Sequence, residues 1–244
     1  MAFDIGLRHT RRMDVNYFLH ERADFIRQLY DTATAPMVET KRRIDAKEAP
    51  FDNPPYCEDG QPAFLDEWLQ ADAQIEVLGR TGVSMLSEAL KQFFVNWEKR
   101  TLIGDRPCQK ECRKAFEGGF LAGYRVCFTD AFGLDWATCP ANLDVVEQVV
   151  LARNRAQHGD LILNHIEHDD ATRSKFPRPF FMRPDEPTFD DGDPTSFMYP
   201  MLHINRETLF HAIAEVEQLC SWLQEGIGHW EDKRWADLNS SAPR

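Results

Sequence analysis

The sequence predicts an all-α protein, and three observations favour that fold class. Apolar residues recur at three- and four-residue spacing over 64–97, 143–150 and 209–223, as they do on the buried face of a helix. Residues suited to helix starts, Pro62 and Asn142, precede two of these stretches. No internal repeat or linker divides the chain, so we expect one mainly helical domain over 1–244.

The composition is that of an ordinary soluble globular protein. Hydrophobic residues make up 43% and charged residues 28% of 244 positions, which is enough to bury a core. No apolar run approaches the roughly 18 residues that cross a bilayer, and the start of the chain lacks the apolar core of a signal peptide. A cytoplasmic location without membrane association is therefore expected.

The cysteines give no sign of a disulfide framework or a metal centre. They are Cys57, Cys108, Cys112, Cys127, Cys139 and Cys220. This density is too low for a disulfide-stapled fold, so reduced thiols are expected. Cys108 and Cys112 could meet on one helical turn, but no second pair completes a zinc site. The sequence predicts no metal and no cofactor.

The formal net charge of −12 argues against a general binder of polyanions. Nonspecific affinity for nucleic acid comes mainly from Lys and Arg on phosphates. A nuclease needs a local positive site more than a positive total. If the chain acts on RNA, its contacts must be local.

The first 60 residues are expected to form a helical extension outside the main core. Asp14 is suited to cap a helix that runs to about Thr32. Pro36 is suited to the first turn of a second helix, which would end near Lys47. Residues 49–61 have the composition of a loop.

The longest periodic stretch begins at Pro62 and ends near Arg100. Its apolar and aromatic positions are expected to form core. Gly79 and Gly82 interrupt it, which indicates either a bend or a place where another helix approaches closely.

The middle of the chain is less regular. A loop with Gly104 and Pro107 precedes one helix, or a pair of short helices, that ends near Phe132. Residues 160–203 are rich in Pro, Asp and aromatic residues and have little periodicity. We expect them to form a long irregular excursion with a short strand or two, and such loops are often functional.

The last strong element is a helix from about Arg206 to Gln224, capped by Asn205. The tail that begins at Ile227 is expected to dock or fray.

The segment from Asn142 to Asp160 combines an apolar helix with polar residues at its far end. Asn142 is a plausible N-cap, and Gly159 is a natural stop, so a helix from about Leu143 to His158 is expected. That helix would deliver an arginine, an asparagine and a histidine at its end.

These polar residues continue an apolar stripe. Leu143, Val146 and Val150 share one helix face, and Arg153 and Asn154 follow on the same stripe. On an ideal helix Asn154 lies roughly 100° from Arg153 and one turn from position 158, so all three side chains could face a common groove.

Spacing alone does not carry the argument, because Arg206 and His211 have the same separation. That second pair opens a helix and is expected to be ordinary surface. The first pair closes an apolar helix, and Asn154 directly follows its arginine.

Residues Arg153–His158, R-N-R-A-Q-H, resemble the R-x4-6-H motif of the HEPN superfamily, in the form in which a polar residue follows the arginine. The resemblance implies a HEPN-like helical bundle with a core from about 62 to 225. It also implies a metal-independent endoribonuclease, usually dimeric, of the kind found in toxin–antitoxin, phage-defence and RNA-processing systems.

On this resemblance Arg153 and His158 are the catalytic pair and Asn154 supports them. RNA can be cleaved without a metal when its own 2′-hydroxyl attacks the neighbouring phosphate. Arginine can hold two phosphate oxygens, and histidine titrates near neutral pH. A helix C-terminus favours the imidazolium form, which suits His158 to the role of acid.

A single histidine cannot easily serve as base and acid at once. A symmetric homodimer that joins two motifs would supply two histidines and two arginines to one groove. An antitoxin or other regulatory protein is a further expected partner. Some HEPN toxins are silenced by modification of a tyrosine two residues after the motif histidine, but this chain has Asp160 there.

Basic residues near the motif are candidates for RNA binding. They are Arg155, Arg173, Lys175, Arg178 and Arg183. Over 171–183 they alternate with Phe176, Phe180 and Phe181, as in grooves that bind single strands. The alternative is an ordinary loop whose phenylalanines anchor it to the core.

Two other functions are open. The cluster His165, Glu167, His168, Asp169 and Asp170 could serve a metal-dependent hydrolase, although a solvated acidic turn has the same composition. A HEPN-like module could instead act only in binding or dimerisation. Arg153 would then pair with a carboxylate such as Glu147 or Asp160, and His158 would be an ordinary helix-terminal residue.

Overall fold

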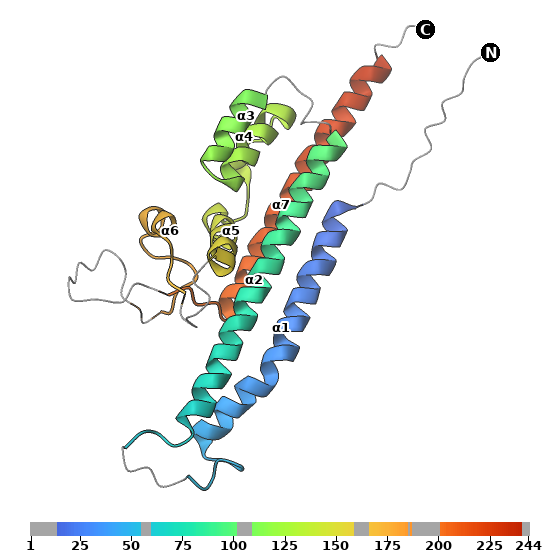
Figure 1. Cartoon of the computed structure of the whole chain (residues 1–244). Coiled ribbons are helices and arrows are strands. Elements are labelled where there is room, and N and C mark those ends of the chain that lie inside the picture. Colours follow the sequence, from blue (N-terminus) through green and yellow to red (C-terminus); the bar gives the residue numbers. More distant parts are fainter. Residues whose placement is uncertain are drawn as a thin grey trace.

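The computed structural model describes residues 14–54, 60–101, 109–158, 166–184, 186 and 201–240. These residues form long and short helices, which confirms the all-α class (Figure 1). The helices are α1 (Val15–Ala46), α2 (Leu65–Thr101), α3 (Gln109–Glu117), α4 (Phe120–Phe132), α5 (Leu143–His158), α6 (Asp170–Lys175) and α7 (Arg206–Ser240), with a 3₁₀ turn at Trp136–Thr138.

The long helices α1, α2 and α7 lie side by side and form an elongated bundle (Figure 1). The chain reverses direction between α1 and α2, so these two helices are antiparallel. Fully buried residues of all three meet along the bundle axis, among them Ile26, Leu90 and Ile213. Residues 15–46, expected as an extension, therefore contribute directly to the core.

The two glycines of α2 mark a close approach, which was one of the two expected alternatives. A Cβ at Gly79 would overlap the carbonyl oxygen of Ile204. A Cβ at Gly82 would lie 2.8 Å from Cδ2 of Leu209 and 3.6 Å from Cγ2 of Ile26. The absence of side chains at these positions thus lets α1 and the start of α7 reach α2.

The expected break before Pro36 is wrong, because α1 continues through the proline. Proline removes the backbone donor that would bond the Thr32 carbonyl, and threonine hydroxyls nearby bond other carbonyls of the helix. Thr34 donates to the carbonyl of Tyr30 at 2.8 Å, and Thr40 donates to that of Pro36 at 2.9 Å. Packing of α1 along α2 therefore outweighs the tendency of Pro36 to break the helix.

The predicted N-cap of α1 is confirmed, since Oδ1 of Asp14 accepts the N–H of Tyr17 at 3.1 Å.

The expected end of the last helix near Gln224 is also wrong, because α7 extends to Ser240. Ile227 is fully buried, and the ring of Trp230 meets that of Phe132 edge-on at 5.1 Å between centroids. The helix therefore continues where α4 offers apolar partners. The Asn205 cap is confirmed by a 2.9 Å bond from the Thr208 N–H to Oδ1 of Asn205.

The remaining helices cover one side of the bundle (Figure 1). Of the two forms expected before Phe132, the pair of short helices is observed, as α3 and α4. Helix α5 packs on α2 and α7. Within the described part of the excursion the expected strands reduce to one bridge between Glu167 and Met201, and α6 is a short helix. The loop at Gly104 and Pro107 lies outside the described residues.

Replacing Gly79 by alanine should destabilise the fold, because the new methyl group overlaps backbone that cannot rotate away. We expect a loss of at least about 2 kcal/mol of unfolding free energy in urea denaturation. Gly228→Ala in α7 is the matched control. A Cβ there meets nothing within 4 Å, so it should gain about 0.5–1 kcal/mol from helix propensity. Equal effects of the two substitutions would contradict the close approach.

Candidate functional site

Helix α5 is held firmly at its start. Oδ1 of Asn142 accepts the N–H groups of Asp144 at 3.1 Å and Val145 at 3.4 Å, as expected of an N-cap. The N–H of Asn142 donates to Oε2 of Glu215 on α7 at 2.6 Å. The helix ends at His158, as predicted.

The buried face of α5 differs from the predicted stripe. Val145, Val146, Val149 and Ala152 are buried, whereas Leu143 and Val150 are only partly covered. Arg153 therefore lies at the edge of the apolar face, and Asn154 is exposed. The apolar pattern of the sequence predicted the wrong buried face because the polar residue Gln148 is also buried. Its side chain accepts the Phe180 N–H at 2.7 Å and donates to the Asp144 carbonyl at 3.3 Å, which satisfies its polar atoms.

The structure brings Arg153 and Asn154 together. An N–H of the Arg153 guanidinium donates to Oδ1 of Asn154 at 3.1 Å. Within the described ranges no carboxylate forms an ion pair with Arg153. Glu147, a suggested partner, instead accepts the ammonium of Lys175 at 2.5 Å. In the described part of the chain the guanidinium is thus bonded to a neutral amide and to no carboxylate.

The backbone of His158 completes the last turn of α5, one turn beyond Asn154. The side chain of His158, together with Gly159 and Asp160, lies outside the described residues.

Arg155 has a structural contact. Its Nε donates to the carbonyl of Glu167 at 2.6 Å. Glu167 in turn bridges to Met201, and the N–H of Leu202 donates to the carbonyl of Ile166 at 2.7 Å. This chain of contacts fastens the end of α5 to the two described ends of the irregular segment.

The other predicted RNA-binding cations each have a partner within the chain. Arg173 pairs with Asp170, Lys175 with Glu147, and Arg183 with Asp72 and Glu76 of α2 at 3.5 and 3.4 Å. Arg178 donates to the carbonyl of Pro184 at 3.3 Å.

The phenylalanines of this segment serve mainly as anchors. Phe176 and Phe181 are buried, and Phe180 meets Phe181 edge-on at 4.9 Å and His211 at 5.2 Å between centroids. The buried rings cannot stack on bases without leaving the core.

The residues of the proposed metal cluster are dispersed. His168 is buried, and its Nε2 bonds the Phe181 carbonyl at 2.9 Å. Asp169 caps α6 through the Thr172 N–H at 2.7 Å, and Asp170 binds Arg173. No group of three or more His, Cys, Asp or Glu side chains suited to a metal occurs in the ranges that the structure describes, and His165 lies outside them.

A polar pocket that the sequence did not predict lies beside this segment. It has a volume of about 230 Å³ and is lined by α2 and by residues on either side of the excursion. In it Glu76 binds Nδ1 of His203 and also Arg183, while Oε2 of Glu76 is buried without a hydrogen-bond partner among the described residues. Glu76 and His203 are 127 positions apart, so no local pattern could have joined them.

Comparison of the chain with family models, with curated proteins and with solved structures finds no match. The resemblance to HEPN proteins therefore rests on the motif at Arg153–His158 and on the helical class. None of the helices in the described ranges combines the length and apolar character needed to cross a bilayer.

Acidification should weaken the fold around His168. Burial lowers the pKa of this imidazole below its ordinary value of 6.5. Below pH 6.5 the unfolded chain therefore takes up a proton that the folded chain excludes. Stability is fully present above that pH and should fall by about 1.4 kcal/mol per pH unit until the folded-state pKa is reached.

Urea denaturation between pH 7.5 and pH 5 measures this effect. His168→Gln keeps a donor for the Phe181 carbonyl and should flatten the dependence. His211→Gln, at an exposed position, should leave it unchanged. A profile that His168→Gln does not alter would contradict the assignment.

Proposed function

We propose that this protein is a metal-independent endoribonuclease of the HEPN type, with its reaction centre at the end of α5. In this proposal Arg153 binds the scissile phosphate, Asn154 positions the guanidinium, and His158 transfers a proton. A role as a toxin or phage-defence effector, controlled by an antitoxin or another regulatory protein, fits such an activity.

The observation that carries the proposal is the state of Arg153. In a chain of net charge −12, its guanidinium is bonded to the Asn154 amide, and no carboxylate in the described ranges pairs with it. Several other cations of the chain, among them Lys175 and Arg183, are held by acids. An arginine that is oriented but not neutralised can accept a phosphate in the bidentate geometry that guanidinium groups favour.

The chemistry follows from these groups. The 2′-hydroxyl oxygen of RNA attacks the adjacent phosphorus and loses its proton to water. The bond from phosphorus to the 5′-oxygen breaks, and His158 in its imidazolium form protonates that oxygen. The products are a 2′,3′-cyclic phosphate and a free 5′-hydroxyl. Arg153 stabilises the negative charge that builds on the phosphate oxygens.

Arg206 and His211, which have the same spacing as Arg153 and His158, offer a matched control for the site. Arg153→Ala and His158→Ala should each reduce RNA cleavage at least about a hundredfold, because each removes a group that acts on the reacting atoms. Arg206→Ala and His211→Ala have the same spacing but should retain activity. Arg206 pairs with Asp31 at 2.7 Å, and His211 contacts Glu215 at 3.0 Å.

These assays are run with excess chelator and purified RNA. Cleavage that survives chelation and is lost only in the α5 variants supports the proposal. Loss of cleavage on chelation would favour the metal-dependent hydrolase. A wild-type protein that cleaves no RNA would favour the alternative function, a HEPN-like module that acts only in binding or dimerisation.

RNA binding away from the reaction centre is proposed for Arg155, Arg173, Lys175, Arg178 and Arg183. Changing Arg173, Lys175, Arg178 and Arg183 together to glutamine should weaken RNA binding and flatten its dependence on salt, because fewer phosphate counterions are displaced. Fluorescence anisotropy at several salt concentrations measures both quantities. Unchanged affinity and slope would mean that internal ion pairs fully occupy these cations.

A homodimer that brings two Arg153–His158 motifs to one interface belongs to the proposal, because it would supply two histidines and two arginines to one groove. The outer surface near the helix end carries the exposed polar residues Asn154 and Gln157.

A further inference from the structure

A serine, a histidine and a glutamate lie in contact where α1 packs on α7. Nδ1 of His20 on α1 is 3.0 Å from Oε1 of Glu217 on α7, and Nε2 of the same ring is 3.5 Å from Oγ of Ser221. Glu217 and Ser221 are one turn apart on α7, so a single imidazole ring from α1 contacts both. Hydroxyl, imidazole and carboxylate follow one another in the order of a nucleophilic triad.

The partners of these groups determine where the protons lie. A carboxylate only accepts hydrogen bonds, so Nδ1 of His20 carries the proton that it donates to Glu217. In a neutral ring Nε2 is then an acceptor, and it lies within reach of the Ser221 hydroxyl. Nδ2 of Asn16 donates to Oγ of Ser221 at 3.1 Å, which leaves the hydroxyl proton for His20. The 3.5 Å separation of Oγ and Nε2 is that of a contact that tightens when substrate binds.

The carboxylate that orients the ring is itself held. Nη1 of Arg27 donates to Oε1 of Glu217 at 3.1 Å, and Nη2 donates to Oε2 at 2.5 Å, which is the two-bond geometry of arginine with a carboxylate. The side chain of Glu217 is 15% exposed, whereas that of His20 is 43% exposed and Ser221 is partly covered. The two groups that would react with a substrate can therefore be reached from solvent, while the orienting group is shielded.

Other histidines pair with a carboxylate but not with a hydroxyl. His203 binds Glu76, and His211 contacts Glu215. In the described part of the chain no serine or threonine oxygen bonds the second ring nitrogen of either histidine. The contact of His20 with both a carboxylate and a serine thus goes beyond the ion pairs that the other histidines form.

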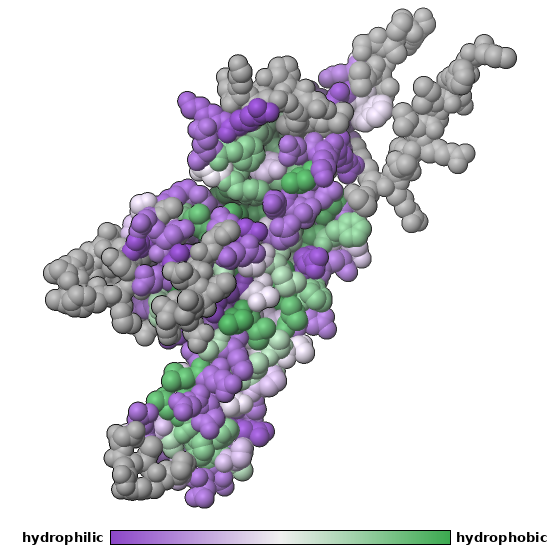
Figure 2. Space-filling view, in the orientation of Figure 1, coloured by the Kyte–Doolittle hydropathy of each residue, from purple (hydrophilic) through white to green (hydrophobic). Residues whose placement is uncertain are grey.

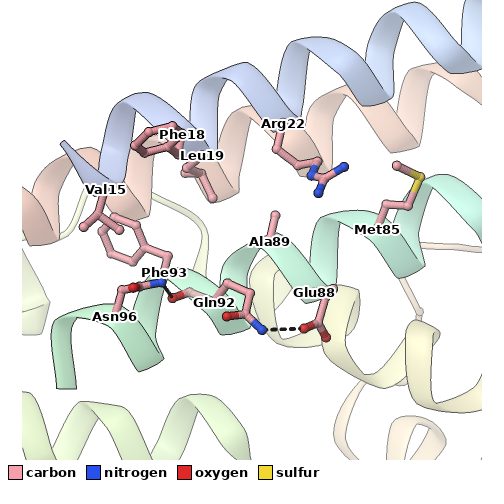
Figure 3. A pocket seen from close by; sticks show the side chains of 10 residues that line it. All are labelled: Val15, Phe18, Leu19, Arg22, Met85, Glu88, Ala89, Gln92, Phe93 and Asn96. Carbon is pink, nitrogen blue, oxygen red and sulfur yellow. Dashed lines mark hydrogen bonds between the residues drawn. The ribbon is translucent and has the colours of Figure 1, made fainter. Parts of the chain in front are cut away.

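The surface beside the triad offers contacts for an apolar acyl or aryl group. Tyr17, one turn before His20 on α1, is 55% exposed, and its ring meets that of Phe18 edge-on at 5.6 Å between centroids. Figure 2 shows hydrophobic residues among hydrophilic ones on the surface of the long helices. The groove between α1 and α2 is a separate feature, because Leu19 and Arg22 of α1 line it and His20 does not (Figure 3).

We propose that the α1–α7 contact is a second catalytic site, which hydrolyses small carboxylic esters through an acyl group held on Ser221. Ser221 is the nucleophile, His20 is the base, and Glu217 positions the imidazole. The site shares no residue with the proposed ribonuclease centre on α5, so it does not depend on that proposal.

The reaction is a double displacement at the ester carbon. Oγ of Ser221 attacks this carbon while Nε2 of His20 takes the hydroxyl proton, and the Asn16 amide donates to the carbonyl oxygen as negative charge builds on it. The bond from carbon to the alcohol oxygen breaks, and His20 passes its proton to that oxygen. Water then attacks the acyl group on Ser221, with His20 taking the proton of the water and returning it to Oγ. One ester and one water give a carboxylic acid and an alcohol.

A fluorophosphonate reagent tests the nucleophile in the wild-type chain, because it reacts with serines whose hydroxyl is activated by a base. Peptide mass spectrometry should find the label on Ser221. His20→Gln keeps a donor for Glu217 but removes the base, and it should slow labelling at least about tenfold. Ser240, on the same helix, is the matched control: its hydroxyl donates to the Asp237 carbonyl at 2.9 Å and should stay unlabelled.

Hydrolysis of p-nitrophenyl acetate by the full chain provides the second arm. Ser221→Ala and His20→Gln should each lower kcat at least about tenfold, and Glu217→Gln should lower kcat with little change in KM, because it disturbs only the orientation of His20. Ser240→Ala and His211→Gln should leave the rate unchanged. The second of these controls measures hydrolysis by an exposed imidazole alone.

Far-UV circular dichroism and RNA cleavage are recorded for each variant. Ser221→Ala removes one hydroxyl and should leave both unchanged, so failure of the esterase and failure of the nuclease proposal are distinguishable. A label that is absent from Ser221, or ester hydrolysis that Ser221→Ala does not slow, would overturn the proposal and leave the three residues as a structural contact between helices.

Discussion

The arrangement of the molecule depends on one close contact, where α2 lacks side chains at Gly79 and Gly82. The Ile204 backbone and the Leu209 side chain occupy that space, and Cγ2 of Ile26 in α1 lies 3.6 Å from the position that a Cβ of Gly82 would take. This contact sets where α7 begins along α2. It also holds residues 201–204 beside α2, where His203 meets Glu76 and Met201 bridges to Glu167. Through Glu167 the same constraint reaches Arg155 and the last turn of α5.

Electrostatics distinguishes Arg153 from many other cations of the chain. The chain is strongly acidic, and many of its cations are used internally, as Lys41 is by Asp72 and Arg27 by Glu217. Arg22 and Arg153 differ, because neither pairs with a carboxylate in the described ranges. An unneutralised guanidinium is available to a group from outside the chain. In our account that group is an RNA phosphate for Arg153.

Local signals were sufficient for features that depend on a few neighbouring residues. The caps at Asp14, Asn142 and Asn205 and the extent of α5 could be predicted because a side chain and a nearby N–H decide them. The continuation of α1 through Pro36 could not, because packing against α2 decides it. Nor could the buried face of α5, since Gln148 is satisfied by Phe180 from a distant segment. The carboxylates that hold Lys175 and Arg183, and the Glu76–His203 pair, likewise join residues far apart in the chain.

The central claim is that the end of α5 cleaves RNA through the 2′-hydroxyl without a metal. The most direct measurement compares one RNA sequence with its 2′-O-methyl counterpart in excess chelator, with the products analysed by mass spectrometry. The account predicts that the RNA is cut to 2′,3′-cyclic phosphate ends and that the 2′-O-methyl strand stays intact. Cleavage of both strands, or 3′-hydroxyl ends on the RNA fragments, would contradict it.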